Sequence, residues 1–159
     1  MEQADFSCLI ARFGAAATAG DGHALAQCFT EDGVYHDYIY GPHRGRDAIA
    51  DMLENLFHRA AADYDWTFFD PVCVGDIGYA WSLSRFVSTI PEFRGREVVI
   101  DGMSRFVVRD GLIAEYRESV NGGVAMVQLG VAAPRIEKLL KRWAGWLRER
   151  PEVQKYLKP

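Results

Sequence analysis

The first 60 residues place apolar side chains at the spacing of an α-helix. Three such stripes predict three helices, the first ended by Gly20 and the second capped by Asp21. A short strand is predicted at about 34–39, before the third helix, and Gly41-Pro42 ends it. The helices span about 6–20, 21–30 and 46–60, with stripes formed by Phe6, Leu9, Ile10, Phe13, Ala17, Leu25, Phe29, Ile49, Met52, Leu53, Leu56 and Phe57.

After residue 60 the apolar period changes from 3.6 to 2, which is typical of β-strands. Four stretches rich in Val, Ile, Phe, Tyr and Trp follow. Gly75-Asp76, Pro91 and Asp110-Gly111 separate them, and Asp110-Gly111 is a strong hairpin signal. Short connections predict antiparallel neighbours. The four predicted strands are Asp63–Val74, Gly78–Ile90, Gly95–Arg109 and Leu112–Val120.

The tail returns to a helical pattern. Pro134 suits a helix start, a wide Leu and Trp stripe follows, and Pro151 ends it. Helices first and strands after them predict an α+β fold rather than βαβ units. We therefore expect one domain over residues 1–159, with 122–159 as a helical C-terminal extension. The Trp and Leu stripe is expected to be core or a subunit contact, with a ligand lid as a further alternative.

Composition narrows the class of protein. The chain is 49% hydrophobic and 25% charged, which fits a folded domain, and its net charge of −4 disfavours nucleic-acid binding. No apolar run reaches a membrane span, and the start carries no basic region, so we expect no membrane insertion, no signal peptide and a cytoplasmic protein. Cys8, Cys28 and Cys73 are expected to be buried, reduced core residues.

A carboxylate on an inward strand face is informative, because burial of an uncompensated charge is costly. In the last predicted strand, alternation puts Glu118 on the face of Tyr116, so Glu118 should point into the core or a cavity. The face is Leu112, Ala114, Tyr116, Glu118 and Val120, opposed by Ile113, Glu115, Arg117, Ser119 and Asn121. Desolvation would raise the pKa of Glu118 and suit it to proton transfer; the alternative is a buried structural salt bridge.

The strand Val34-Tyr35-His36-Asp37-Tyr38 is unusually rich in Tyr, His and Asp. Tyr35 and Asp37 share one face, and His36 and Tyr38 share the other. Either face could be inward, or the strand could be an exposed edge with a solvated His-Asp pair.

Glu54 and His58, four apart on the third helix, could in principle hold a metal with Asp51 nearby. No further His or Cys cluster supports this, so we expect a solvated helix face and no metal.

Several motifs together resemble the nuclear transport factor 2-like superfamily over about Phe6 to Asn121. They are Ala19-Gly20-Asp21, Phe29-Thr30-Glu31-Asp32-Gly33, Gly45-Arg46-Asp47-Ala48-Ile49 and Asp110 through Glu118. The superfamily includes ketosteroid isomerases, SnoaL-like polyketide cyclases, scytalone dehydratase and limonene epoxide hydrolase. The resemblance implies a cone-shaped, curved antiparallel sheet wrapped on N-terminal helices around an apolar pocket. It also implies a homodimer, for which the exposed sheet face is a candidate surface.

Compared with ketosteroid isomerases, Asp37 is similar in position to the general base. Phe13 stands where that family has the oxyanion-hole tyrosine, so the hydroxyl is missing. Asp101 or Gly102 stands where it has a protonated aspartic acid.

Compared with limonene epoxide hydrolase, Tyr35 and Asp37 match residues that hold water, and Glu118 matches the Asp that activates it. That family's Arg-x-Asp falls near Ser82 and Ser84, so its acid and Arg are missing.

We therefore expect an enzyme without metal or organic cofactor that transfers protons on a small hydrophobic molecule, cyclic or aromatic. Asp37 or Glu118 would remove a proton, and Tyr35 or His36 would position or return one. Alternatives are a non-catalytic small-molecule-binding or dimerisation domain, and epoxide-hydrolase-like water activation. The expected substrate-binding residues are Phe13, Tyr38, Tyr40, Trp81, Ser82, Ser84, Phe86, Asp101, Ser104 and Tyr116.

Overall fold

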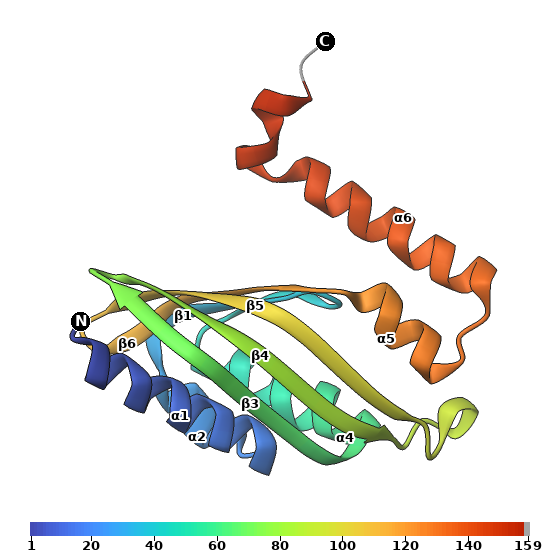
Figure 1. The fold of residues 1–159 in the computed structure, drawn as a ribbon, viewed down its shortest axis with the longest axis horizontal. Helices are drawn as coiled ribbons and strands as arrows, with labels where there is room; N and C mark the ends of the chain where they lie inside the picture. Colours follow the sequence, from blue (N-terminus) through green and yellow to red (C-terminus); the bar gives the residue numbers. More distant parts are fainter. Residues whose placement is uncertain (158–159) are drawn as a thin grey trace.

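A single curved sheet of six strands organises the computed structural model, which describes residues 1–157 (Figure 1). The strand order is β2-β1-β6-β5-β4-β3, and every neighbouring pair is antiparallel except β1 and β6. The strands are β1 Phe29–Asp37, β2 Gly41–Arg44, β3 Ala61–Val74, β4 Ile77–Ser88, β5 Glu97–Arg109 and β6 Leu112–Val120. The expected α+β class and the four long strands are confirmed, each to within two or three residues at its ends.

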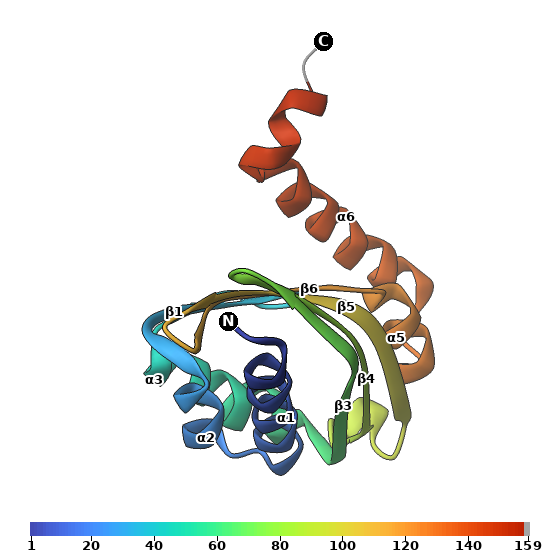
Figure 2. The ribbon, with the colours of Figure 1, turned by 60° about the vertical axis from the view of Figure 1, so that its left-hand side comes forward.

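Helices occupy both sides of the sheet. Figure 2 shows the sheet arching over the N-terminal helices, whereas α6 stands on the convex side. The helices are α1 Gln3–Ala19, α2 Gly22–Gln27, α3 Arg46–Asp51, α4 His58–Ala60, α5 Gly122–Leu129 and α6 Ala133–Glu149. A π-helix, Met52–Phe57, joins α3 to α4, and short 3₁₀ turns occupy Pro91–Phe93 and Pro151–Tyr156. No helix in the described residues is long and apolar enough to span a membrane.

The helix α1 ends, and α2 begins, where the sequence predicts. Gly20 closes α1 in the left-handed region with φ of 70°, and the Asp21 carboxylate accepts from the Ala24 N–H to cap α2. The second helix ends at Gln27, three residues earlier than predicted. Phe29 and Thr30 instead begin β1, because Phe29 pairs with Ile113 in the parallel ladder.

The core lies between α1 and the concave face of the sheet. Phe13 is fully buried and contacts six aromatic rings: Phe29, Tyr35, Trp66, Phe68, Phe106 and Tyr116. Such aromatic clusters dominate core energetics through their large buried area. The space between α1 and the sheet around Phe13 is therefore filled with side chains.

Simple alternation fails in β6. The register shifts between Val107 and Val108 of β5, so that Ile113 and Tyr116 are both fully buried. An extra residue at Ala114 rotates the strand, as a β-bulge does. The prediction that Ile113 lies on the face opposite Tyr116 was therefore wrong, although Glu118 keeps the face of Tyr116.

The cysteines differ from one another in exposure. Cys28 is buried and Cys73 half-buried, but Cys8 is exposed, and the cysteines are free in the described residues. Cys8 precedes Leu9 by one position and so lies about 100° off the apolar stripe of α1. The expectation of three buried cysteines was wrong for Cys8.

The C-terminal helices begin at the sheet edge. Beyond the end of β6, the Gln128 side chain accepts from the Val99 N–H at 2.9 Å and donates to the Val99 carbonyl at 2.8 Å, so α5 completes the free edge of β5. A second apolar cluster of Phe93, Val98, Ala125, Leu129 and Val131 holds α5 in place. The helix α6 then leaves over the convex face (Figure 1).

Candidate active site

Parallel pairing of β1 with β6 brings two carboxylates together. Tyr35 is directly opposite Tyr116 in this ladder. Asp37 and Glu118 each lie two residues further along parallel strands, on the same faces as those tyrosines. Adjacent strands are separated by about 4.8 Å, so Asp37 and Glu118 are neighbours.

Asp37 is held by the turn that follows β1. The side chain is only 7% exposed, and its Oδ1 accepts from the backbone N–H groups of Ile39, at 2.8 Å, and of Tyr40. Such turns fix an Asp without a cationic partner. Burial raises the pKa of Asp37 to about 6, although these backbone donors oppose the increase.

Glu118 ends a short chain of hydroxyl groups. The Tyr116 hydroxyl donates to Glu118 Oε2 at 3.0 Å, and the buried Ser104 Oγ lies 3.0 Å from the same phenolic oxygen. Burial, and after it the charge of Asp37, raise the pKa of Glu118 to about 8. Because the two carboxylates interact, they titrate as a pair, and their raised pKa values favour one shared proton near neutral pH.

Tyr35 lies behind the two carboxylates. Its ring is fully buried, 4.5 Å from that of Tyr116, and its hydroxyl has no hydrogen-bond partner among the described residues. Burial raises the pKa of Tyr35 well above its usual value, so the hydroxyl stays protonated and can donate.

Tyr64 is a functional candidate that sequence reasoning missed. A β-bulge between Ala62 and Asp65, with Asp63 at φ of 52°, redirects this residue. Its ring stacks between His58 at 4.8 Å and Phe86 at 5.4 Å. Burial, then the charges of Glu118 and Asp37, raise the pKa of Tyr64. Two-residue alternation cannot locate such a bulge, and a φ near +50° at Asp63 leaves only a weak sequence signal.

The concave wall of β4 and β5 contains several of the predicted residues. Ser82 and Ser104 are buried on this face. Ser84 and Phe86 lie on the same face and are half-buried. The Ser82 hydroxyl donates to the Gly102 carbonyl at 3.3 Å. A side chain at Gly102 would approach Val120 within 2.6 Å and the Ser119 carbonyl within 2.8 Å, so an acid does not fit there. Phe13, enclosed by aromatic rings, belongs to the core rather than to the substrate wall.

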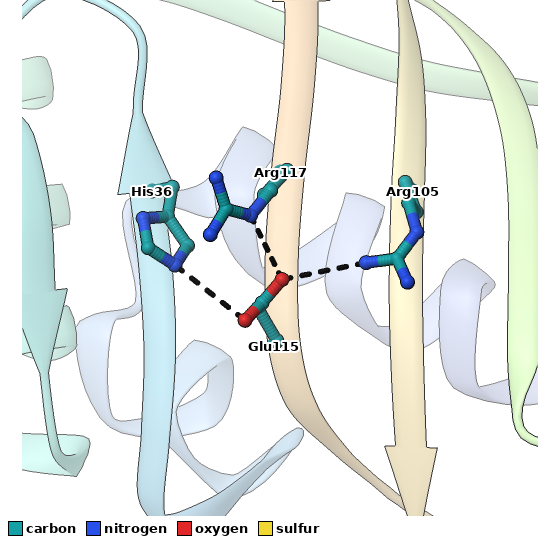
Figure 3. Close-up of polar contacts among 4 residues, drawn as sticks. All are labelled: His36, Arg105, Glu115 and Arg117. Atoms are coloured by element: carbon teal, nitrogen blue, oxygen red, sulfur yellow. Dashed lines mark hydrogen bonds and ion pairs between the residues drawn. The ribbon is translucent and has the colours of Figure 1, made fainter. Parts of the chain in front are cut away.

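Three predicted site residues lie on the convex face instead. Figure 3 shows His36 with Glu115, Arg105 and Arg117, where Glu115 accepts from Arg117 at 2.8 Å and from Arg105 at 3.3 Å. His36 Nε2 lies 3.8 Å from Glu115. Because β1 directs Tyr35 and Asp37 inward, alternation turns His36 outward. Trp81 and Asp101 are exposed on the same outer side, since Ser82 and Ser104 face inward.

Tyr38 and Tyr40 follow Asp37 in the chain, and their side chains contact different parts of the molecule. The Tyr38 ring packs edge-on against Trp143 of α6 at 5.1 Å, so its side chain connects the site strand to the tail. Tyr40 is exposed, and its ring lies 6.5 Å from that of Phe57, a further residue that the sequence prediction missed. The Tyr40 N–H donates to Asp37 Oδ1, so this residue begins directly beside the carboxylate.

Glu54 and His58 have structural partners. Glu54 accepts from the Gly22 N–H at 3.2 Å, and His58 Nε2 lies 2.8 Å from the Ala17 carbonyl. Both contacts tie the third helical segment to α1 and α2. No group of three or more metal-ligating side chains occurs in residues 1–157.

Three surface hollows of about 540, 280 and 580 Å³ lie elsewhere, and neither Asp37 nor Glu118 lines any of them. They are found beside the N-terminus, at the end of β4, and between α5 and α6.

Comparison with known proteins gives a family and several structural relatives. A family model described as "SnoaL-like domain" matches residues 10–116, more than half of the chain. No curated protein matches the sequence. TsrD from Streptomyces laurentii superposes with a TM-score of 0.72 at 21% identity, covering 83% of this chain and 99% of that one.

Two further solved structures share the fold. An M. tuberculosis epoxide hydrolase described as like limonene epoxide hydrolase has a TM-score of 0.66 at 16% identity, covering 81% of this chain and 92% of its own. IdmH from Streptomyces antibioticus, a proposed polyketide cyclase, has a TM-score of 0.65 at 25% identity, covering 79% and 98% respectively.

Proposed function

The chain belongs to the SnoaL-like domain family of the nuclear transport factor 2-like superfamily, and on that premise we propose that it is a cofactor-independent enzyme of general acid-base chemistry. Its substrate is a small, hydrophobic, cyclic or aromatic molecule. Asp37 acts as the base, and protonated Glu118 acts as the acid or hydrogen-bond donor.

The observation that carries this proposal is the position of Asp37 and Glu118 on paired neighbouring strands, beside the buried Tyr35 and Tyr116. Burial raises the pKa of Asp37 to about 6 and that of Glu118 to about 8, on either side of neutral pH. An efficient general base or acid has a pKa near the working pH, and two carboxylates with separated titrations supply one of each. A purely structural carboxylate would be expected to have a cationic partner, which neither residue has among the described contacts.

The chemistry follows from these protonation states. Asp37 removes a proton from a carbon next to a carbonyl group, and the developing oxyanion accepts a hydrogen bond or proton from Glu118. Tyr64 supplies a second donor beside both carboxylates. Isomerisation, dehydration, retro-aldol cleavage and cyclisation all pass through such an enol or enolate. We place this protein within that group of isomerase and lyase reactions.

The surroundings favour a neutral substrate. Phe57 packs against Tyr35 and Tyr64 stacks on Phe86, so the side chains around these tyrosines are aromatic, whereas Arg105 and Arg117 are turned to the convex face. A substrate carboxylate or phosphate would meet the negative charge of Asp37 without compensation. The M. tuberculosis relative favours a second route, in which Glu118 activates water, but the Arg-x-Asp pattern of limonene epoxide hydrolase is replaced by Ser82 and Ser84.

A non-catalytic binding or dimerisation domain is the rival from another class. Aromatic side chains fill the core between α1 and the sheet, and the three hollows lie away from the carboxylates. In that case the two carboxylates would only shape a ligand site.

A proton-exchange assay distinguishes the enzyme from the non-catalytic domain without knowledge of the natural substrate. Cyclic ketones such as 2-tetralone are incubated in D₂O, and loss of the α-proton signal is followed by NMR. The wild type should accelerate exchange, and Asp37→Asn should reduce the rate by about a hundredfold or more. Glu118→Gln should reduce it by a smaller factor, because an amide still donates a hydrogen bond. Asp101→Asn, the same change on the exposed convex face, is the matched control.

Binding of the same ketones is measured in parallel. Retained affinity in the Asp37 variant with lost exchange supports the enzyme. If the wild type binds the ketones yet accelerates exchange no more than the Asp37 variant does, the protein is a binding module.

A further inference from the structure

The loop that follows β1 provides the polar support of Asp37. Asp37 pairs with Gly41 across the hairpin of β1 and β2, so residues 38–40 form the loop between the two strands. Two N–H groups of this loop, those of Ile39 and Tyr40, donate to Asp37 Oδ1. Asp37 takes part in no ion pair among the described residues. The position of these N–H groups therefore decides how well a negative charge on Asp37 is stabilised.

The Tyr38 side chain holds this loop from the other side of the sheet. Its ring packs edge-on against that of Trp143 in α6, with 5.1 Å between the ring centroids. Both ribbon views place α6 on the convex side of the sheet, whereas the buried Asp37 is directed to the concave side (Figures 1 and 2). Tyr38 comes between Asp37 and Ile39 in the chain, so the loop cannot rotate away from the carboxylate unless the Tyr38 ring also moves.

Trp143 lies against the ends of both strands that carry the carboxylates. Its side chain is only 6% exposed. A Cβ at Gly122, the first residue of α5, would lie 2.7 Å from Cζ3 of Trp143 and 3.2 Å from Cε1 of Tyr38. The indole ring therefore contacts the chain one residue beyond Asp37 and four residues beyond Glu118.

The contact depends on the ring of Trp143 rather than on its polar group. The indole Nε1 is buried and has no hydrogen-bond partner among the described residues. A Phe at this position would keep a ring against Tyr38 and remove only an unsatisfied donor, whereas Ala would remove the packing. Trp146 on the same helix is exposed, with the Arg142 guanidinium carbon 5.2 Å from its ring. It is therefore a matched control for the loss of a Trp from α6.

We propose that Trp143 is a positioning residue for the candidate active site: by packing on Tyr38, it holds the 38–40 loop where the loop N–H groups meet Asp37. This inference rests on the proposed function, because the contact affects turnover only if Asp37 is the base. The C-terminal helix thereby controls the base without touching the substrate. Burial raises the pKa of Asp37 and the loop donors oppose that rise, so release of the loop should raise this pKa further.

Carbon-13 NMR titration of the Asp37 carboxyl group tests the contact without any substrate. The protein is labelled at the side-chain carboxyl carbons of Asp, and the Asp37 signal is assigned by its absence from Asp37→Asn. Trp143→Ala should raise the pKa of Asp37 by about 0.5 or more, whereas Trp143→Phe and Trp146→Ala should leave it unchanged. An unchanged or lower pKa in Trp143→Ala, or an equal rise in either of the other two variants, overturns the proposal.

Tyr38→Ala removes the same contact from the opposite side, and it replaces Trp143→Ala if that variant does not fold. It should reproduce the rise in the pKa of Asp37. The double variant should show no larger rise than either single variant, because both substitutions break one contact. Additive rises would mean that Trp143 acts by a route other than Tyr38 and would contradict the proposal.

Kinetics connect the contact to the proposed function. In the exchange assay with 2-tetralone, Trp143→Ala should lower the rate constant at saturation by about tenfold with KM changed little, because a misplaced base is felt mainly in the transition state. The acid limb of its pH profile should move to higher pH together with the Asp37 titration, and Trp143→Phe should restore both. Equal rate constants in an active wild type and in Trp143→Ala would overturn the proposal. A wild type that exchanges no ketone, although the pKa of Asp37 still depends on Trp143, would refute the proposed function and support the contact.

Discussion

The raised pKa of Glu118 also makes the stability of the folded protein depend on pH. Its pKa in the folded protein, about 8, is above the ordinary value of 4.5, so the folded state binds the proton more tightly than the unfolded state does. The stabilisation from this proton is fully present below the ordinary pKa and is lost as pH rises through about 8. We therefore predict that the free energy of unfolding falls between pH 5 and pH 9.

Glu118→Gln should remove most of that dependence. The amide cannot ionise, so the variant should be more stable than the wild type at pH 9, by on the order of a few kcal/mol, with a smaller difference at pH 5. Urea unfolding at a series of pH values measures this. Asp101→Asn should leave the slope unchanged. An equal pH slope in wild type and Glu118→Gln would show that Glu118 is ionised in the folded protein.

Tyr64 is predicted to act on turnover rather than on folding. Tyr64→Phe keeps the ring between His58 and Phe86 and removes only the hydroxyl near the carboxylates. The proton-exchange rate constant at saturation should fall about tenfold or more, with KM changed little, because the donor matters most when oxyanion charge develops. A change confined to KM would instead make the hydroxyl a ground-state binding group.

The residue scale also shows where sequence reasoning failed. Asp37 and Glu118 could be chosen because an acid on an apolar face is costly to bury. His36 could not be placed, since both faces of its strand are rich in polar and aromatic groups. Trp81 was misplaced because a large aromatic residue suits a pocket wall and an exposed sheet face equally well. Only the strand register, which directs Ser82 inward, shows that Trp81 lies on the exposed face rather than in a pocket wall.

At the scale of elements, four strand positions and the α6 bounds were predictable because turn residues mark them. Asp110 and Gly111 both have positive φ, 53° and 80°, as the hairpin signal requires. Two β-bulges, at Asp63 and Ala114, were not predictable. Each shifts the inward face by one residue, and each lies on a strand that carries a candidate site residue. The parallel pairing of β1 with β6 depends on contacts between residues more than 80 positions apart, which local patterns do not record.

Gly78 provides a test of how tightly α1 packs on the sheet. A Cβ at this position would lie 2.2 Å from Cζ of Phe6, whose ring is fully buried and 5.6 Å from Phe106. Gly78→Ala should therefore destabilise the protein by about 1–3 kcal/mol, because the core cannot move aside freely. Chemical denaturation measures the change. Gly145→Ala, where nothing lies within 4 Å of the new Cβ, should be neutral or slightly stabilising; similar losses in both would exclude steric packing as the cause.

At the scale of the whole molecule, the tail is attached to the site strand through one aromatic contact. Trp143 is buried against Tyr38, and its ring lies within 2.7 Å of where a Cβ would be at Gly122, so that position has to be glycine. The amphipathic stripe predicts that α6 is a helix, but it cannot say on which side of the sheet it lies. That direction is set by the turn at Gly130, with φ of 80°, and by the edge contacts of Gln128.

Trp143→Ala should release α6 while leaving the sheet intact. The substitution removes the ring that holds the helix to Tyr38, so hydrogen exchange in residues 133–149 should become faster by about tenfold or more. Exchange in β6 should hardly change, because the backbone partners of that strand come from β1 and β5. Exchange followed by mass spectrometry resolves the two regions. Trp146→Ala, at an exposed ring on the same helix, is the control, and equal acceleration in both variants would mean that α6 is held by contacts other than the one between Trp143 and Tyr38.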